Sequence, residues 1–425
     1  MTTTSATLPP EAAEGLENPR PLVKGTIRRL LGWIIPANFS IFILWGAIPG
    51  VLLPLQITAI DPENRVGSLA VVSTVGAFLA MLAQPIAGTI SDRTRSRFGR
   101  RAPWMVAGVL VGGLALVGIA SASTILQVAI AWSIVQIAYN FTQGPLSAIL
   151  PDRVPRSARG TFSALAGLGA MLGALGGQIV GAMFAKNIPA GYLLFAGLAL
   201  IVIVLFVLFN PDHPSTDAPR ERFVLGDFLR TFWVNPVKHP DFFWAFTGRL
   251  LLYTGYFAVT GYQLFILSAY IGLGDDGAAA MIPLFGLVSL AGIIVGTVAS
   301  GPLSDRLGRR KVFVFISSVL VGVTLVVPMV MPTVNGWFIF AAVSGLGFGI
   351  FQSVDQALMS EVLPSSASFG KDLGVVNIAA TLPQTLAPAV AGAIVLAFGY
   401  VGLFPVGIVL SILGAFAVWF IKAVR

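Results

Sequence analysis

Two residues of opposite charge lie well inside long apolar stretches of the sequence, where they could bind an ion, a proton or each other. Asp355 is the carboxylate and Arg249 is the cation. A charge at the centre of a membrane helix costs about 2.5–3.5 kcal/mol, so each needs a partner. At about 1.5 Å per helical residue, Arg249 lies about 12 Å past Asp241 and Asp355 about 9 Å before Glu361. These similar depths predict a salt bridge between the two.

Amide and tyrosine side chains recur at helical spacing in several apolar stretches and form a second kind of candidate site. Arg249, Tyr253, Tyr256, Thr260 and Gln263 follow one another at three- and four-residue steps on one face. Such stripes can hydrogen-bond a small polar solute or hold helices together. The predicted substrate-binding residues are Gln56, Tyr139, Asn140, Gln143, Tyr253, Tyr256, Gln352, Gln356 and Gln384, with Trp45 as a stacking surface.

The composition indicates that these stretches are membrane spans. Hydrophobic residues make up 56% of the 425 residues, charged residues make up 10%, and the mean hydropathy is +0.87. Soluble domains carry about 25% charged residues, and a span needs about 20 apolar residues. Twelve spans are predicted, at residues 35–58, 66–90, 104–122, 126–150, 158–184, 190–210, 241–268, 279–301, 311–331, 336–361, 370–397 and 399–421. The expected fold class is an all-α membrane protein.

The basic residues predict how the spans are oriented. Of the 26 Lys and Arg residues, all except Arg65, Lys186 and Arg249 fall in the terminal segments or in loops on one side of the predicted spans. Loops rich in these residues face the cytoplasm. We therefore expect a multi-pass protein of the cytoplasmic membrane with both termini inside. The formal net charge of +8 would then face anionic lipid headgroups, and nucleic-acid binding is not expected.

Cysteine and histidine usage excludes several kinds of chemistry. The chain has no cysteine, and its two histidines, His213 and His239, lie outside the predicted spans. Disulfides, thiolate chemistry and cysteine-ligated metals are therefore excluded, and no metal site or cofactor is expected. Proton handling inside the membrane falls to a carboxylate. No phosphate-binding Gly-x-x-x-x-Gly-Lys-Ser/Thr motif is present, which argues against ATP-driven chemistry.

The sequence contains an internal repeat of 213 residues. Asp92 and Asp305 are separated by this distance, as are Gln143 and Gln356. The repeat predicts two six-helix bundles, at residues 33–210 and 241–425, after an N-terminal tail at 1–32 and joined by a linker at 211–240. Parallel six-span halves are typical of transporters that bind their substrate near the membrane midplane.

The repeated loops resemble the signature loop of the major facilitator superfamily. The first loop has Gly88, Asp92 and Arg93 followed by Gly99, Arg100 and Arg101. The longer string from Ser91 to Trp104 is similar to the glycoside-pentoside-hexuronide cation symporters and the sucrose transporters beside them. The span at 66–90 has no acidic residue, whereas melibiose-type members carry an acidic pair there for sodium. Sodium coupling of that type is therefore not expected.

The resemblance implies that the repeated loops latch the two halves together on the cytoplasmic side. Asp92 should face the start of the eleventh span near Gly370, and Arg93, Arg100 or Arg101 should meet Asp152. The second loop would contribute Asp305, Arg306, Arg309 and Arg310. In the alternative interpretation, these charges only set the topology of the chain.

The charged pair has three interpretations. In the first, Asp355 takes up the proton that couples transport to a proton gradient, and Arg249 stabilises its ionised form until the two are separated. In the second, the pair is purely structural. In the third, Arg249 alone binds the carboxylate or phosphate of an anionic substrate.

The resulting hypothesis is a proton-coupled secondary transporter, not an enzyme, that imports a sugar or glycoside. The alternative is a proton-driven exporter of drugs or hydrophobic metabolites. A glycine run in the span at 158–184 resembles a motif of drug antiporters but lacks its proline, and it is typical of close helix packing. The expected partners are a small solute, a proton and the lipid bilayer, with a monomeric chain.

Overall fold

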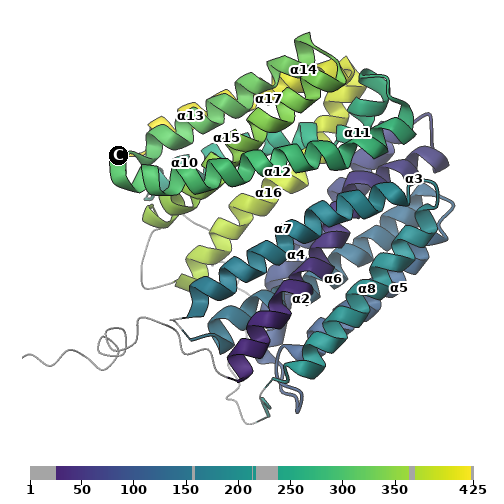
Figure 1. Cartoon of the computed structure of the whole chain (residues 1–425), viewed down its shortest axis with the longest axis vertical. Helices are drawn as coiled ribbons and strands as arrows, with labels where there is room; N and C mark the ends of the chain where they lie inside the picture. The colour runs from purple at the N-terminus through teal and green to yellow at the C-terminus, as the bar shows by residue number, and fades with distance from the viewer. Residues whose placement is uncertain (1–24, 156–157, 213, 217–237, 363–368, 423–425) are drawn as a thin grey trace, which may run out of the picture.

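The computed structural model is helical throughout the residues that it describes, which are 25–155, 158–212, 214–216, 238–362 and 369–422. Within these ranges, the side chains of 301, 302, 305, 356, 357, 360, 361 and 369–380 are not described. Figure 1 shows two helical bundles side by side, one purple to teal and the other green to yellow.

The N-terminal bundle contains six spans. The first consists of α2 (Thr26–Ala47), the π-helical segment η1 (Ile48–Leu52) and α3 (Leu53–Ile60). The others are α4 (Arg65–Arg93), α5 (Ala102–Ala120), α6 (Ile125–Arg153), α7 (Arg159–Met183) and α8 (Ile188–Phe209).

The C-terminal bundle repeats this order. Its first span is broken into α10 (Pro240–Thr260), α11 (Gln263–Phe265) and the π-helical segment η3 (Ile266–Tyr270), with a bend of 45°. It continues with α12 (Gly274–Leu307), α13 (Arg310–Thr324), α14 (Val326–Val330), α15 (Val334–Glu361), α16 (Phe369–Phe398), η4 (Tyr400–Gly402) and α17 (Leu403–Trp419). Among the described residues, eleven helices are long and apolar enough to cross a membrane, and the bent pair makes a twelfth if it counts as one span, which confirms the predicted fold class.

The first span begins nine residues before its predicted start at residue 35, at Thr26. Gly25, at φ 64°, precedes the first turn. Arg28 and Arg29 lie in this turn and are exposed. The hydrophobic pattern therefore left the turn out of the predicted span, although its backbone is helical. The predicted tail at 1–32 therefore ends inside α2.

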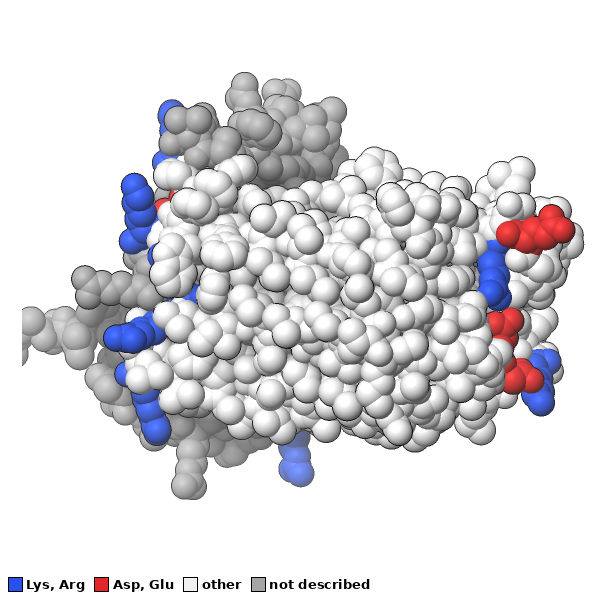
Figure 2. Space-filling model, turned by 90° about the horizontal axis from the view of Figure 1, so that it is seen from above, with Lys and Arg blue, Asp and Glu red and all other residues white. Residues whose placement is uncertain are grey.

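The charged residues gather at two ends of the molecule, with an uncharged band between them on the face shown in Figure 2. We call one the mixed-charge end, defined by Asp61, Glu63, Arg65, Lys186, Asp275 and Asp276. We call the other the basic end, defined by Arg28, Arg29, the loop at 93–101, Arg153, Arg159, Arg306, residues 309–311 and Lys422. The white band is the surface expected to face lipid.

Glycine allows close contact between α2 and α7. Gly169, Gly173 and Gly177 recur every four residues, and a β-carbon added to any of them would collide with the backbone of α2. In the other bundle, Gly292 and Gly296 of α12 approach the α15 backbone in the same way. Small residues bring membrane helices together because lipid supplies no hydrophobic drive for their association. The glycine run of α7 therefore serves packing.

Two helix pairs form most of the interface between the bundles. Helix α4 packs on α16, and α7 packs on α12. Helices α5, α8, α13 and α17 pack within their own bundles. These four are the spans that lack amide, acidic and basic side chains in their cores, so they can lie against lipid while the other helices enclose the centre.

Candidate functional site

A cavity of about 1220 Å³ lies between the two bundles. From the N-terminal bundle it is lined by α2, η1 and α7, and from the C-terminal bundle by α10, α11, α12, α15 and α16. Its polar lining residues are Gln178, Tyr256, Thr260, Gln263, Ser289, Thr297, Ser344, Gln352, Ser353 and Gln384, and Trp45, Phe257, Phe285, Trp337 and Phe340 add aromatic surface. No lining residue in the described part of the chain is charged.

Three of the predicted substrate-binding residues line the cavity. They are Tyr256, Gln352 and Gln384. Tyr256 stacks on Phe348 with the ring centroids 4.4 Å apart, and Ser289 lines the same cavity. A planar ring held in this way, beside amides that line the same cavity, offers both stacking and hydrogen bonds to a bound solute.

The predicted residues of α6 lie behind the indole of Trp45. Its Nε1 donates to Oε1 of Gln143 at 3.3 Å, and its ring meets Tyr139 edge to face at 6.3 Å. Asn140 is buried and donates to the backbone oxygen of Gln136 in its own helix. Tyr139, Asn140 and Gln143 therefore do not line the cavity in this conformation, because Trp45 covers α6.

Two other predicted residues also lie outside the cavity lining. Gln56 is buried and donates from Nε2 to the backbone oxygen of Ile119 at 2.7 Å. Tyr253 is 7% exposed and packs against Phe351 and Phe348. Both therefore contribute to packing within their own bundles. The side chain of Gln356 lies outside the described residues, so its role remains a prediction.

Gln178 and Trp337 line the cavity although the sequence did not single them out. Gln178 is the one amide in α7, within a run of small and aliphatic residues. Cavity-lining positions on α7 include Gly167, Ala170, Ala174 and Gln178, which are spaced at three or four residues. In the sequence, Gln178 follows small residues at helical spacing, and this pattern could have identified it as a residue on the same face.

Asp355 and Arg249 form the predicted ion pair, deep within the C-terminal bundle. Nε and Nη2 of Arg249 each lie 2.5 Å from Oδ2 of Asp355, and the two side chains are 3% and 2% exposed. Neither residue lines the cavity, but each is on a helix that does. Asp355 is one turn from Gln352, and Arg249 is two turns from Tyr256. A change in the cavity can therefore reach the pair through α10 and α15.

The bundles meet at the mixed-charge end. Arg65 pairs with Asp275 at 3.6 Å and lies over the ring of Phe265 at 5.1 Å. Lys186 approaches Asp276 at 3.9 Å. Such exposed pairs contribute at most about 1 kcal/mol each. They therefore align the two bundles at this end more than they stabilise the contact.

Below these ion pairs, the contact between the bundles is closely packed. The Tyr262 hydroxyl donates to the backbone oxygen of Val66 at 3.1 Å. A β-carbon on Gly392 would collide with Ala70, and one on Gly286 with Gln178. These contacts hold the two bundles together at this end, and we therefore call the mixed-charge end closed.

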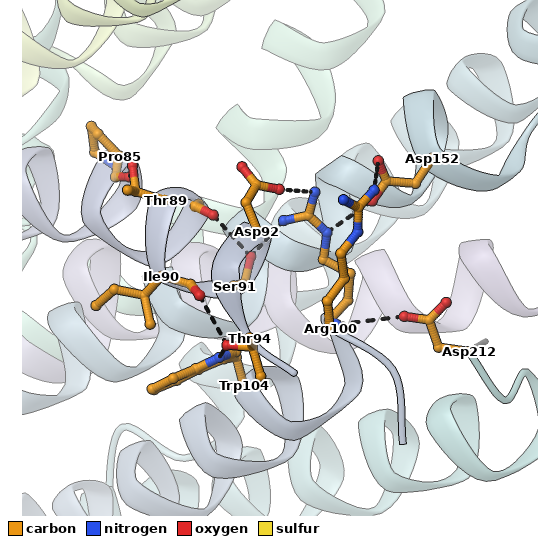
Figure 3. A network of polar contacts seen from close by, with 12 residues as sticks. Pro85, Thr89, Ile90, Ser91, Asp92, Thr94, Arg100, Trp104, Asp152 and Asp212 are labelled. Atoms are coloured by element: carbon orange, nitrogen blue, oxygen red, sulfur yellow. Dashed lines mark hydrogen bonds and ion pairs between the residues drawn. The ribbon is translucent and has the colours of Figure 1, made fainter. Parts of the chain in front are cut away.

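At the basic end, Arg101 connects the first repeated loop to α4 and α6, and Figure 3 shows the network around Ser91, Asp92 and Asp152. Its guanidinium lies 2.5 Å from Oδ1 of Asp92, 2.9 Å from Oδ2 of Asp152 and 2.5 Å from the hydroxyl of Ser91. Arg100 adds a 2.6 Å contact to Asp152. The predicted meeting of Arg100 or Arg101 with Asp152 is therefore present, and it joins α4, the loop and α6 within one bundle.

The loop also binds the first residues after α8. Gly99 has φ 85°, and a β-carbon there would collide with the carboxylate of Asp212. The backbone nitrogen of Ser96 donates to the hydroxyl of Ser215 at 3.1 Å, and the nitrogen of Ser215 donates to the Ser96 oxygen at 3.1 Å. The start of the predicted linker is thus bound to the loop.

The remaining predictions for the latch are not tested by the described residues. The side chain of Asp305 and the side-chain surroundings of α16 near Gly370 are not described, so their contacts with Asp92 or an arginine stay predictions. Gly308 has φ 60°, which matches the left-handed Gly99 of the first loop. Arg306 and Arg309 are exposed, and Arg310 is half-buried.

Replacing Arg101 with Ala is expected to lower the unfolding free energy by about 1–3 kcal/mol, because Arg101 is buried and its removal takes away the hydrogen bonds that it makes to Asp152 and Ser91. Arg100→Ala is the matched control, since Arg100 makes a single contact to Asp152, is more exposed and should cost less than about 1 kcal/mol. Thermal unfolding of the purified variants measures both. Equal effects would show that Arg101 does not organise the loop.

Twelve spans in two repeated bundles around a central cavity define a polytopic membrane transport protein. The chain belongs to the Major Facilitator Superfamily, whose sequence pattern it matches over residues 34–300 and 288–425. In the solved structure of a mutant of the nucleoside transporter NupG, 99% of that chain superposes on 92% of this one with a TM-score of 0.74 at 17% identity. The structural likeness supports the fold.

Relatives with curated names are distant in sequence. The inner membrane symporter YicJ of Escherichia coli is 24% identical, covering 76% of this chain and 71% of its own. Sucrose transport protein SUC4 of Arabidopsis thaliana is 24% identical and covers 75% of each chain. The agnestins efflux protein AgnL12 of Paecilomyces divaricatus is 27% identical over 39% of this chain and 37% of its own.

Proposed function

We propose that this protein imports a neutral sugar or glycoside together with a proton across the cytoplasmic membrane. The observation that carries the proposal is the lining of the central cavity, where amides, hydroxyls and aromatic rings occur and no described residue is charged. Such a surface can hydrogen-bond the hydroxyls of a sugar and stack on its ring. A substrate carboxylate or phosphate would find no cation among these residues, which disfavours the anionic-substrate interpretation of Arg249.

The basic end is proposed to face the cytoplasm, following the excess of Lys and Arg in cytoplasmic loops. The inter-bundle contacts of the mixed-charge end would then lie on the outer side of the membrane, which supports interpreting this conformation as inward-facing. Movement of one bundle against the other would open the outer side during the cycle. The loop network around Arg101 lies within the N-terminal bundle and would move with it.

The Asp355 and Arg249 pair is proposed as the proton-coupling site. A carboxylate with this burial needs its cationic partner when ionised, and protonation removes the charge that holds Arg249. The pair joins α10 to α15, two helices that both line the cavity. Protonation can therefore change how these helices pack around the substrate.

The relatives support the coupling and the substrate class in different ways. The name of YicJ describes a symporter, and the name of SUC4 describes sucrose transport. Both are 24% identical to this chain, and at that distance the residues that select a solute can differ. The substrate class thus rests mainly on the neutral cavity.

Uptake of radiolabelled sugars into proteoliposomes tests the proposal. With the medium outside more acidic than the lumen, we expect at least one of sucrose, maltose, melibiose and methyl α-D-glucopyranoside to accumulate above its external concentration. A protonophore should remove the accumulation without preventing equilibration. Folded protein with no flux of any sugar would contradict the sugar assignment.

The second candidate function is proton-driven export of hydrophobic metabolites. The efflux protein AgnL12 is among the relatives, and the aromatic part of the cavity lining could accommodate an apolar solute. The same vesicles separate the two functions, because an exporter would drive a hydrophobic dye against its gradient and leave the sugars unmoved.

A further inference from the structure

Gln178 occupies an unusual position in the contact between the bundles. Its side chain lines the cavity from α7. Its Oε1 is buried and has no hydrogen-bond partner among the described residues. A β-carbon on Gly286 of α12 would collide with this oxygen, so the amide lies directly against the bare α-carbon of the opposite bundle.

Because this contact joins α7 to α12 across the two bundles, opening of the mixed-charge end would break it. When α12 moves away from α7, water can reach the amide oxygen and hydrogen-bond to it. Closure removes that water and supplies no donor from the described residues in return. A buried acceptor left without a partner disfavours the state in which it is buried, so Gln178 opposes closure of the empty protein.

A bound solute can remove this penalty. The amide lies at the boundary of the cavity, and rotation about its last side-chain bond exchanges the positions of Oε1 and Nε2. A hydroxyl group both donates and accepts hydrogen bonds, so a polyhydroxylated solute can satisfy either end of the amide. A solute without a donor cannot satisfy the oxygen.

We infer that Gln178 is a substrate-sensing residue that makes closure of the mixed-charge end depend on a hydroxyl-bearing solute in the cavity. The inference rests on the proposed function for the identity of the solute. The penalty on empty closure does not depend on that identity. Gln178 thereby determines specificity at the step of closure as well as at binding.

The test measures closure directly, in the full chain, with and without sugar. The chain has no cysteine, so Lys186→Cys and Asp276→Cys provide the only two spin-labelling sites, one on each bundle. These side chains are 84% and 77% exposed and 3.9 Å apart, and loss of so exposed a pair changes stability little. Distances between the labels report the ratio of closed to open molecules in nanodiscs.

Gln178→Leu should raise the closed-to-open ratio of the sugar-free protein about tenfold, because an apolar side chain needs no donor. Sucrose and methyl α-D-glucopyranoside should shift the parent protein toward closure and shift the variant much less. Gln178→Met is a second apolar variant with an unbranched side chain of similar length. Gln56→Leu is the matched control, because Gln56 also has a buried Oε1 without a described partner but lies within one bundle.

The outcomes separate this inference from the proposed function. An unchanged closed-to-open ratio in both Gln178 variants, or an equal change in Gln56→Leu, would overturn the inference even if sugars close the parent protein. A shift in the Gln178 variants alone would support it. If the sugars then fail to close the parent protein, the sugar assignment is contradicted while the penalty at Gln178 stands.

Discussion

Asp355→Asn is expected to abolish proton-driven accumulation of substrate while leaving exchange of substrate across the membrane intact. Asn has nearly the same shape as a protonated Asp but cannot release a proton, so the variant would remain in the protonated form of the cycle. Proteoliposomes loaded with unlabelled sugar measure exchange, and the same vesicles under a pH gradient measure accumulation. The expected loss of accumulation is complete, within the leak of empty vesicles.

The neighbouring charge requires a second variant. Asp355→Asn leaves the guanidinium of Arg249 buried at 3% exposure, and breaking a buried pair by removing one partner costs about 3–5 kcal/mol. The double variant Asp355→Asn with Arg249→Gln removes both charges and should recover stability in thermal unfolding. If the double variant accumulates sugar under a gradient, the pair is structural and Asp355 does not couple transport to protons.

Gly177→Val should prevent the N-terminal bundle from assembling. A β-carbon at this position would lie 2.8 Å from the nitrogen of Ala47 and 3.0 Å from the α-carbon of Gly46, and it would be closer still to the oxygen of Ile43. These are backbone atoms of α2, which cannot rotate away as a side chain can. Overpacking of this kind typically costs about 1–3 kcal/mol, and branching at the β-carbon adds to the collision, so we expect about 3 kcal/mol or more.

Gly160→Val is the matched control on the same helix. A β-carbon at Gly160 meets nothing within 4 Å, so the same chemical change should leave the yield of folded protein nearly unchanged. Size-exclusion profiles and thermal unfolding of the two variants give the comparison. Equal loss of folded protein would indicate that valine harms α7 through helix propensity and not through the contact with α2.

Most of the fold could be predicted because membrane insertion depends on properties that belong to individual residues. The length of each apolar stretch defines a span, and the excess of basic residues in the loops on one side indicates how the spans are oriented. Helix α2 begins before the predicted start of the first span because Arg28 and Arg29 lie in its first turn, where charged side chains can remain at a helix end near the membrane surface. The π-helical segments η1 and η3 were not predicted, because a wider turn leaves no mark in hydropathy.

The candidate site could be predicted less well, because periodicity groups residues by face without showing what that face contacts. The row of polar residues from Arg249 to Gln263, along α10 and the start of α11, illustrates this. Arg249 and Tyr253 are buried within the bundle, whereas Tyr256 and Gln263 line the cavity, since the helix crosses from its own core into the space between bundles. The position of Trp45 in front of Gln143 likewise depends on tertiary packing.

The uncharged lining of the cavity has an electrical consequence. A neutral solute that crosses with one proton carries one positive charge, so each cycle of the proposed symport is electrogenic. The membrane potential then contributes about 2.3 kcal/mol per charge for each 100 mV, which corresponds to roughly fiftyfold accumulation. Because a neutral solute carries no charge to offset that of the proton, voltage as well as acidity would drive import, and a cell at neutral external pH could still concentrate the solute.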